Sequence, residues 1–180
     1  MSLRNRIAAL AALVAQLDAT SLEDGPEPYE REEIDLTDIA EAEGWREHTI
    51  YAGIGETVEA VNAAGHRLAV VTAKNEPHAR KIVTALPFGH RFEDIIGATP
   101  DGRLSHKPEL IAEALTRLGL RPEHCTMIGD RHLDIEGAQH HGMRGIGVLW
   151  GFGSEDELRD AGAYALVRTP EALPALLLDA

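Results

Sequence analysis

Two carboxylates, Asp130 and Asp134, stand four residues apart in the stretch GDRHLD. Hard oxygen ligands of this kind suit Mg²⁺, which takes one or two carboxylates from a protein and keeps several of its waters. The same residues also have an ordinary structural use, because Asp134 can cap a helix and Asp130 can occupy a turn. Taken alone, the pair leaves both interpretations open.

Two more residues could take part in phosphate chemistry. Thr72 ends the apolar run LAVVT, and Lys107 begins the stretch KPELIAEAL. A hydroxyl and free backbone N–H groups between a strand and a helix can hold a phosphate, and a lysine can neutralise a phosphoryl group. Each residue alone is more often structural or solvated. Together with the aspartate pair, they predict a site for a phosphorylated ligand and Mg²⁺.

Regular elements from residue 51 onward would position these residues. We expect strands at 67–72, 125–129, 145–151 and 163–168, a short strand within 92–98, and helices at 55–65, 76–86, 107–119, 134–142, 154–162 and 170–178. Strands that alternate with helices are typical of a parallel sheet with helices on both faces. Ligands bind such sheets beyond the carboxyl ends of the strands. The pattern therefore places Thr72, Ala73 and Lys74 on the same edge as Asp130 and Asp134.

The N-terminal region has a different pattern. Apolar residues at helical spacing, with many alanines, predict a helix over residues 3–17. A Pro, Gly and acid-rich break at 23–33 predicts a loop, and residues 36–45 read as a short helix. We therefore divide the chain into an N-terminal region, 1–48, and a core domain, 49–180.

The composition excludes several classes of partner. The 17 basic and 30 acidic residues give a net charge of −13, which argues against binding to nucleic acid or to an anionic membrane. No apolar run reaches the roughly 18 residues that a transmembrane helix needs, and we expect no signal peptide. The single Cys125 predicts a buried core residue and a cytoplasmic protein. His132, His140 and His141 match no strong zinc pattern.

The motifs resemble those of a known family. LAVVTAK, KPELIAEALTRLGL, MIGDRHLDIEGAQHHGM and GVLWGFGSEDELRDAGA are similar to motifs II, III and IV and to the C-terminal strand and helix of the haloacid dehalogenase (HAD) superfamily, in particular its phosphoglycolate phosphatase-like subfamily. The resemblance covers residues 51 to 180. It implies a Rossmann-like three-layer α/β/α fold with a parallel sheet, here with a reduced or absent helical cap.

The resemblance also implies an activity and roles for the site residues. The family's enzymes are Mg²⁺-dependent phosphatases that form an aspartyl-phosphate, and a small phosphorylated metabolite is the implied substrate. By this resemblance Thr72 and Ala73 bind phosphate, Lys107 steadies the nucleophile and the phosphoryl group, Asp130 binds Mg²⁺ and Asp134 supports the metal site. The resemblance leaves a homodimer open.

The family's nucleophile is the part that this sequence lacks. It lies in a D-x-D-G-T motif at the end of a strand near the N-terminus, with the second Asp as acid/base. The nearest string here is QLDAT, which puts Gln16 at the nucleophile position and Asp18 at the acid/base position. An amide cannot act as that nucleophile.

Three accounts of the N-terminal region are open. In the first, the segment LVAQLDAT is the central strand of the sheet, with a degenerate site. In the second, residues 3–48 are cap-like helices and the nucleophile segment is absent from this chain. In the third, a strand is borrowed from elsewhere in the chain or from another copy. We favour the first, because a gap in the sheet leaves backbone groups unpaired. Two functions follow: a phosphatase impaired by the missing nucleophile, or a non-catalytic pseudophosphatase that serves in binding, regulation or assembly.

Overall fold

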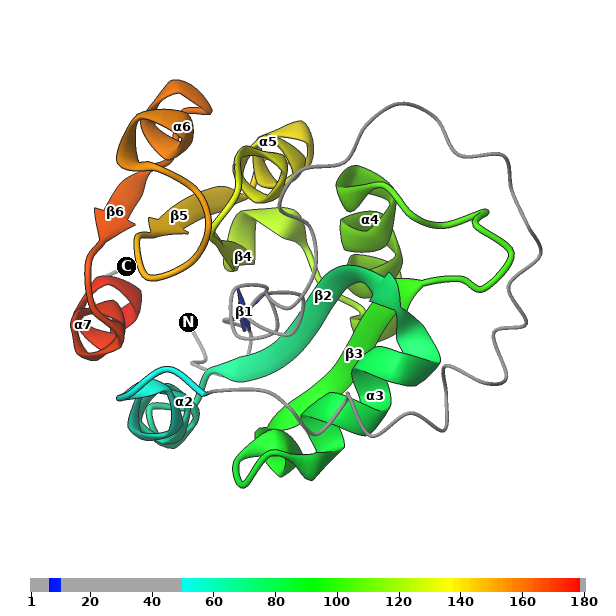
Figure 1. Ribbon diagram of the computed structural model, residues 1–180, viewed down its shortest axis with the longest axis horizontal. Helices are drawn as coiled ribbons and strands as arrows, with labels where there is room; N and C mark the ends of the chain where they lie inside the picture. The colour runs from blue at the N-terminus through cyan, green and yellow to red at the C-terminus, as the bar shows by residue number, and fades with distance from the viewer. Residues whose placement is uncertain (1–6, 11–49, 179–180) are drawn as a thin grey trace, which may run out of the picture.

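The computed structural model describes residues 7–10 and 50–178 (Figure 1). Its described strands form one sheet with the order β3-β2-β1-β4-β5-β6, in which every pairing between neighbours is parallel. The strands are β1 (Ile7–Leu10), β2 (Arg67–Asn75), β3 (Phe92–Ala98), β4 (Cys125–Gly129), β5 (Arg144–Val148) and β6 (Ala165–Val167).

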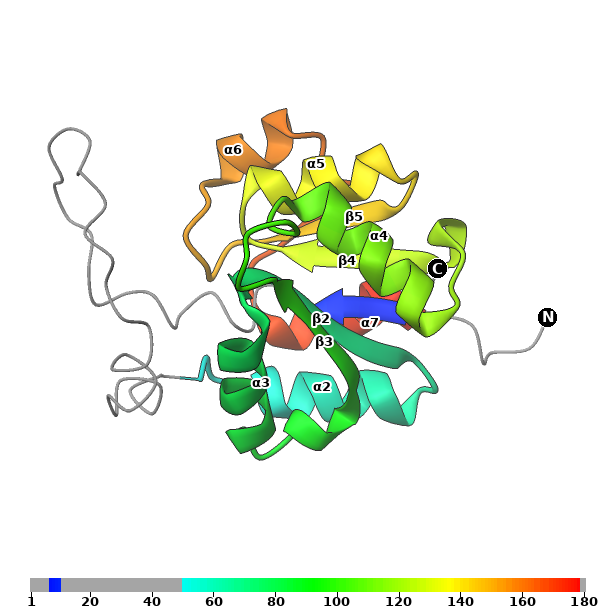
Figure 2. The same ribbon diagram turned by 90° about the vertical axis from the view of Figure 1, so that its right-hand side faces the viewer.

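Helices cover both faces of this sheet. The helices are α2 (Ile54–Ala63), α3 (Glu76–Ala85), α4 (Lys107–Leu118), α5 (His132–His140), α6 (Glu155–Asp160) and α7 (Leu173–Leu178). Figure 2 shows α4, α5 and α6 above the sheet and α2 and α3 below it. The predicted three-layer α/β/α fold is therefore confirmed. Among the described residues, no helix has the length and apolar character needed to cross a membrane.

Local sequence signals fix where several helices begin and end. Pro108 lies in the first turn of α4, where its missing N–H costs nothing. Gly119 ends α4 with φ 64°, a left-handed conformation that glycine adopts without strain. The Ser154 hydroxyl caps α6 by accepting a hydrogen bond from the Glu157 N–H, 3.0 Å away. These ends agree with the predicted helices to within about two residues.

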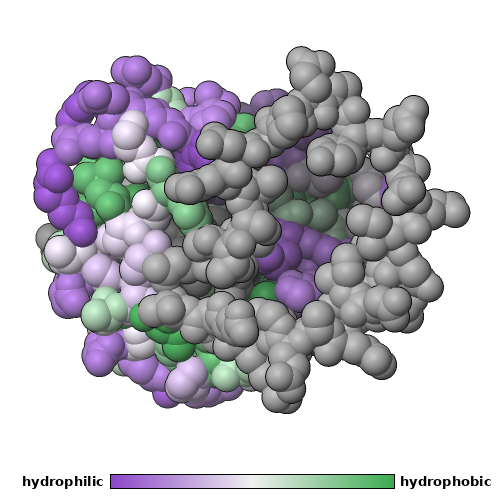
Figure 3. Space-filling model, in the orientation of Figure 1, coloured by the Kyte–Doolittle hydropathy of each residue, from purple (hydrophilic) through white to green (hydrophobic). Residues whose placement is uncertain are grey.

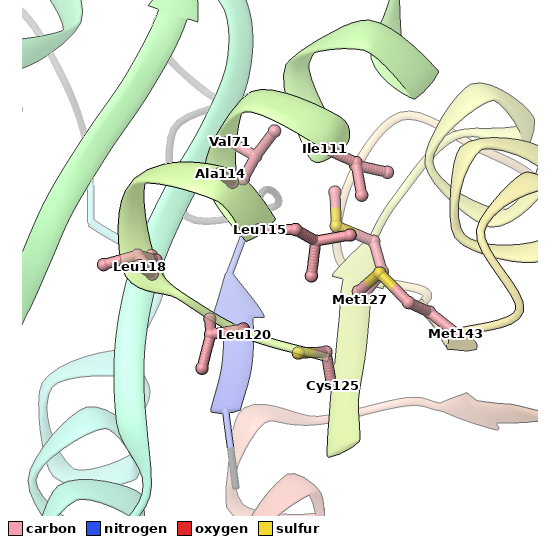
Figure 4. A pocket seen from close by; sticks show the side chains of 10 residues that line it. Val71, Ile111, Ala114, Leu115, Leu118, Leu120, Cys125, Met127 and Met143 are labelled. Carbon is pink, nitrogen blue, oxygen red and sulfur yellow. The ribbon is translucent and has the colours of Figure 1, made fainter. Parts of the chain in front are cut away.

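Two apolar clusters pack on the two faces of the sheet. One joins α2, α3 and α7 to the sheet, and Tyr51 and Trp150 pack against it. The other joins α4 and α5 to the sheet and includes Ile111, Cys125 and Met127. A cavity of about 20 Å³ lies under α4 in this second cluster (Figure 4), which is room for about one water molecule. The prediction that Cys125 is a buried core residue is confirmed.

The central strand corrects the prediction for the N-terminal region. Residues 7–10 form β1, between β2 and β4, so the helix predicted over residues 3–17 is wrong at these positions. The alanines favour a helix locally, but the slot between two strands demands backbone partners, and tertiary context overrides local propensity. The N-terminal region therefore does supply a central strand, as the favoured account required.

The segment that fills this slot differs from the predicted one. The strand ends at Leu10, six residues before Gln16, whereas the favoured account used LVAQLDAT. Gln16 and Asp18 lie outside the described residues, as do the predicted loop at 23–33 and helix at 36–45. The proposed division at residue 48 and the reduced cap remain predictions.

Candidate phosphate and metal site

Lys107 links three parts of the predicted site. As the first residue of α4, it points its Nζ at two oxygens: the Val71 carbonyl at 3.1 Å and Asp134 Oδ1 at 2.8 Å. Both side chains of this ion pair are almost fully buried, with 10% of Lys107 and 6% of Asp134 exposed. Lys107 thus joins Val71 of β2, the residue before Thr72, to the first turn of α5.

Asp134 has a structural role as well as a place in the site. Its Oδ2 accepts a hydrogen bond from the Arg131 backbone N–H at 3.2 Å, which satisfies a donor at the start of α5. Its other oxygen, Oδ1, binds Lys107. The helix-capping alternative for Asp134 is therefore present in the structure, together with the contact to Lys107.

Asp130 follows β4 directly and is only 3% exposed. Its Oδ2 accepts a hydrogen bond from the Phe152 backbone N–H at 2.8 Å. Burial, and then the nearby charge of Asp134, raise the pKa of Asp130, while the Phe152 hydrogen bond acts in the opposite direction. Within the described part of the chain, no lysine, arginine or histidine lies within ion-pair distance of Asp130.

Glycines allow the backbone to approach these two aspartates closely. A Cβ atom on Gly129 would lie 2.2 Å from Asp134 Cβ, and one on Gly151 would lie 2.3 Å from Asp130 Cβ. A Cβ atom on Gly153 would lie 2.0 Å from the Asp130 carbonyl oxygen. All three distances are shorter than side chains tolerate, so the sequence must have glycine here for the loop to pack on Asp130.

Thr72 and Lys74 lie in an irregular part of β2 rather than after it. The strand continues to Asn75, but its pairing with β3 shifts between Val71 and Asn75. In this irregular segment the Thr72 Oγ1 accepts a hydrogen bond from the Lys74 backbone N–H at 3.1 Å. Thr72 is half-buried and Ala73 is exposed. This hydrogen bond from a backbone N–H to the hydroxyl two residues earlier is a local side-chain contact of threonine, and the phosphate-binding role of the segment stays a prediction.

The donor chemistry of the site fits Mg²⁺. Asp130 and Asp134 are buried carboxylates, and a single buried lysine faces Asp134. Lys107 pairs with Asp134, whereas Arg131 acts on Asp130 through its nearby charge. A divalent cation would therefore meet a buried carboxylate, Asp130, that has no direct ion pair among the described residues. No group of three or more His, Cys, Asp or Glu side chains with metal-site geometry occurs among the described residues. Asp130 and Asp134 would therefore hold the ion with waters and the ligand's phosphate.

The end of the central strand lacks the carboxylate that the resemblance requires. β1 runs beside β4, and its last residue, Leu10, lies opposite Ile128, two residues before Asp130. From Met1 to Leu17 the sequence contains no Asp or Glu, and the first acid is Asp18. The sequence directly after β1 is Ala11 and Ala12.

A third carboxylate, Glu157, organises the rim of the site, and it was not among the residues predicted from the sequence. Glu157 Oε1 accepts hydrogen bonds from Arg131 Nε at 2.9 Å and from the His132 backbone N–H at 2.9 Å, and it lies 2.8 Å from His132 Nδ1. These contacts lower the pKa of Glu157 to about 2. His132 is thus bound to α6, and His141 Nε2 lies 2.7 Å from the Pro108 carbonyl.

Comparison with known proteins identifies the family. Residues 3–142 match the haloacid dehalogenase-like hydrolases. The chain belongs to this family. The match includes β1, the Thr72 segment, Lys107 and both aspartates, so this HAD chain has the family's fold around the described site.

Relatives of this HAD chain are phosphate-handling proteins. It is 47% identical to a 5'-nucleotidase from Pseudomonas aeruginosa over 64% of its own length and 52% of the relative's. It is 33% identical to a phosphoglycolate phosphatase from Aquifex aeolicus over 57% and 48% of the two lengths. The chain thus spans about half the length of these curated relatives.

Solved structures give the same result. A predicted phosphatase from Clostridium acetobutylicum is 33% identical, with a TM-score of 0.76 over 79% of this chain and 66% of that chain. The protein tyrosine kinase A of Mycobacterium tuberculosis is 36% identical, with a TM-score of 0.66 over the same shares. The membership of the HAD superfamily that the sequence motifs predict is therefore confirmed.

Proposed function

We propose that this chain is a HAD phosphatase domain that binds Mg²⁺ and a small phosphorylated metabolite, and that its phosphoryl transfer is impaired. The observation that carries the proposal is the buried contact of Lys107 with the Val71 carbonyl and Asp134, beside Asp130. A phosphate at this place meets a fixed cation and the irregular Thr72 segment. The names of two relatives, 5'-nucleotidase and phosphoglycolate phosphatase, support a small phosphorylated ligand.

Each described residue has a separate role in the proposed site. The Thr72 hydroxyl and nearby backbone N–H groups hold the phosphate, and Lys107 neutralises its charge. Asp130 and Asp134 hold Mg²⁺, which, when bound, supplies charge stabilisation to the phosphoryl oxygens. The burial of Lys107 and Asp134 keeps water from screening these charges.

The impairment follows from the sequence after β1. A covalent phosphatase of this type needs a carboxylate nucleophile, and residues 7–17 contain none. The same observation favours a second candidate function, a pseudophosphatase that binds phosphate and Mg²⁺ for regulation or assembly without turnover. Both candidates share the binding half of the site and differ only in catalysis. The cytoplasmic location remains a prediction, and a homodimer remains open.

Two measurements on the purified chain test these candidates. The first is hydrolysis of 4-nitrophenyl phosphate with Mg²⁺, beside an Asp130→Asn variant. The second is calorimetric titration of Mg²⁺ and of inorganic phosphate into both proteins. Slow turnover that Asp130→Asn abolishes supports the impaired phosphatase, and binding without turnover supports the pseudophosphatase. If neither Mg²⁺ nor phosphate binds, both candidates are wrong.

A further inference from the structure

An exposed aromatic ring stands beside Asp130. The Phe152 backbone N–H binds Asp130 Oδ2 at 2.8 Å, yet 53% of Phe152 is exposed. Isolated exposed apolar side chains are common on protein surfaces and by themselves indicate nothing. Phe152 differs from such cases because its backbone is attached to a carboxylate of the proposed site. The backbone from which the Phe152 ring projects therefore lies directly beside the proposed metal site.

The loop that carries Phe152 has little freedom to move away from Asp130. The glycines on either side, Gly151 and Gly153, lie so close to Asp130 that a Cβ on either would collide with it. Figure 1 shows this loop between the end of β5 and α6, at the carboxyl edge of the sheet. A rigid support of this kind holds a contact residue in one position before a ligand arrives, which lowers the entropic cost of binding.

Three neighbouring side chains share the same surroundings. Leu133, in the first turn of α5, is 55% exposed. Trp150, two residues before Phe152, has a buried Nε1–H for which the described part of the chain supplies no hydrogen-bond partner, and such a donor is uncommon unless a ligand or water serves it. Tyr51 packs with Trp150 against the apolar cluster that joins α2, α3 and α7 to the sheet.

We propose that Phe152 is a specificity-determining residue that stacks on a flat ring in the organic half of the phosphorylated ligand. The inference rests on the proposed function, because the phosphate must be bound near Asp130 for the ring to reach Phe152. The substrate class is then a phosphomonoester of an alcohol that carries an aromatic or heteroaromatic ring, with Leu133 as a further apolar contact.

The energetics favour a ring over a saturated group of the same size. An exposed phenyl side chain offers a flat face, and a second flat ring can stack on it in an offset arrangement. Stacking of a nucleic-acid base on an aromatic side chain is worth about 1–3 kcal/mol, or roughly 5- to 150-fold in affinity. A saturated ring buries comparable apolar area but gains no stacking, so the two should bind differently.

A pair of phosphonates tests the proposal without any need for turnover. Their C–P bond is not hydrolysed, so binding can be measured on the chain as it is. We would titrate benzylphosphonate and cyclohexylmethylphosphonate into the protein with Mg²⁺ and compare their dissociation constants by calorimetry. The expected result is a benzylphosphonate affinity at least about fivefold higher.

Two variants locate the preference on Phe152. Phe152→Leu keeps the backbone N–H to Asp130 and an apolar side chain but removes the ring, so it should bind both phosphonates equally and Mg²⁺ as before. Tyr164→Leu is the matched control: it removes an aromatic side chain that is 66% exposed and lies beside Gly145, at the amino end of β5. This control should keep the full preference for benzylphosphonate.

The outcomes distinguish a failure of the ring inference from a failure of the proposed function. Equal affinity of the wild-type chain for both phosphonates overturns the ring inference alone, as does an unchanged preference in Phe152→Leu. Binding of neither phosphonate nor inorganic phosphate overturns the proposed function, and the ring inference with it. A preference for the ring that Phe152→Leu removes and Tyr164→Leu keeps supports the inference.

Discussion

Lys107 and Asp134 form a buried ion pair, with 2.8 Å between Nζ and Oδ1, that ties the first turn of α4 to the first turn of α5. A cation and an anion taken out of water must stay paired, because a single buried charge without its partner costs several kcal/mol. The contact therefore has consequences for stability as well as for ligand binding, and the two can be measured separately.

Removing one partner of this pair should destabilise the fold. We expect Lys107→Met to lower the free energy of unfolding by about 3–5 kcal/mol, because Asp134 is left buried without its cation. Urea denaturation monitored by circular dichroism measures the change. The control is Arg159→Ala, which removes an ion pair with Glu155 in which the Arg159 side chain is 57% exposed. This variant should lower the free energy of unfolding by less than about 1 kcal/mol. Similar losses in both variants would contradict the prediction.

Gly129→Ala should weaken Mg²⁺ binding by displacing Asp134, with little effect on the rest of the fold. The added methyl group would lie 2.2 Å from Asp134 Cβ, so Asp134 must move away from Lys107 and from Asp130. We expect Mg²⁺ affinity to fall at least about tenfold, because a ligand displaced from its geometry is lost. Calorimetric titration of Mg²⁺ measures the effect. Gly55→Ala, in α2, is the matched control and should leave Mg²⁺ affinity unchanged; an equal loss there would point to general destabilisation.

A carboxylate placed directly after the central strand should restore turnover. We expect Ala11→Asp or Ala12→Asp to raise the rate of 4-nitrophenyl phosphate hydrolysis well above that of the wild-type chain, since β1 runs beside β4 and Leu10 lies opposite Ile128. Gln16→Asp, which follows the motif alignment, should not. The comparison is a direct test of which residues occupy the nucleophile position. Restoration by Gln16→Asp alone would favour the alignment over the register of β1.

The stability of the chain should depend on Glu157 at acidic pH. Its pKa is lowered from 4.5 to about 2 in the folded state, so the native protein binds fewer protons than the unfolded chain in this range. The stabilisation is complete above pH 4.5 and is lost as the pH falls towards 2. Glu157→Gln should flatten the fall in unfolding free energy over this window, as measured by urea denaturation at several pH values. Glu136→Gln, on the exposed side of α5, should keep the wild-type slope.

Cys125 should react slowly with thiol reagents while the chain is folded. It is 4% exposed, and burial raises the pKa of its thiol to about 11, so little thiolate exists at neutral pH. We expect 5,5'-dithiobis(2-nitrobenzoate) to label it much more slowly in buffer than in 6 M guanidinium chloride. Rapid labelling in buffer would contradict both its burial and its place in the cluster under α4.

The prediction that nucleic acid is not a partner concerns the charge of the molecular surface. Hydrophilic side chains dominate the area over α6 in Figure 3, and this helix begins with three acidic residues, Glu155, Asp156 and Glu157. With a net charge of −13 for the chain, an anionic polymer would be repelled. This remains a prediction, because no binding measurement enters into it.

The sequence by itself determined most of the core. The pattern over 125–129 predicts the bounds that β4 has, and β3 fills the stretch 92–98 in which the sequence predicts a short strand. Apolar runs bounded by turn residues are typical of buried parallel strands. Thr72, Lys107, Asp130 and Asp134 could be chosen because their types, at strand and helix junctions, fit phosphate and Mg²⁺. These signals are local, so one sequence was sufficient to read them.

Only the tertiary structure decided the remaining features. The alanine-rich residues 7–10 have a local preference for helix and become the central strand only because β2 and β4 offer unpaired backbone groups on both sides. The attachment of Phe152 to Asp130 and of Glu157 to His132 joins residues more than twenty positions apart. Such contacts depend on how α6 and the loop after β5 pack against α5, which no local pattern specifies.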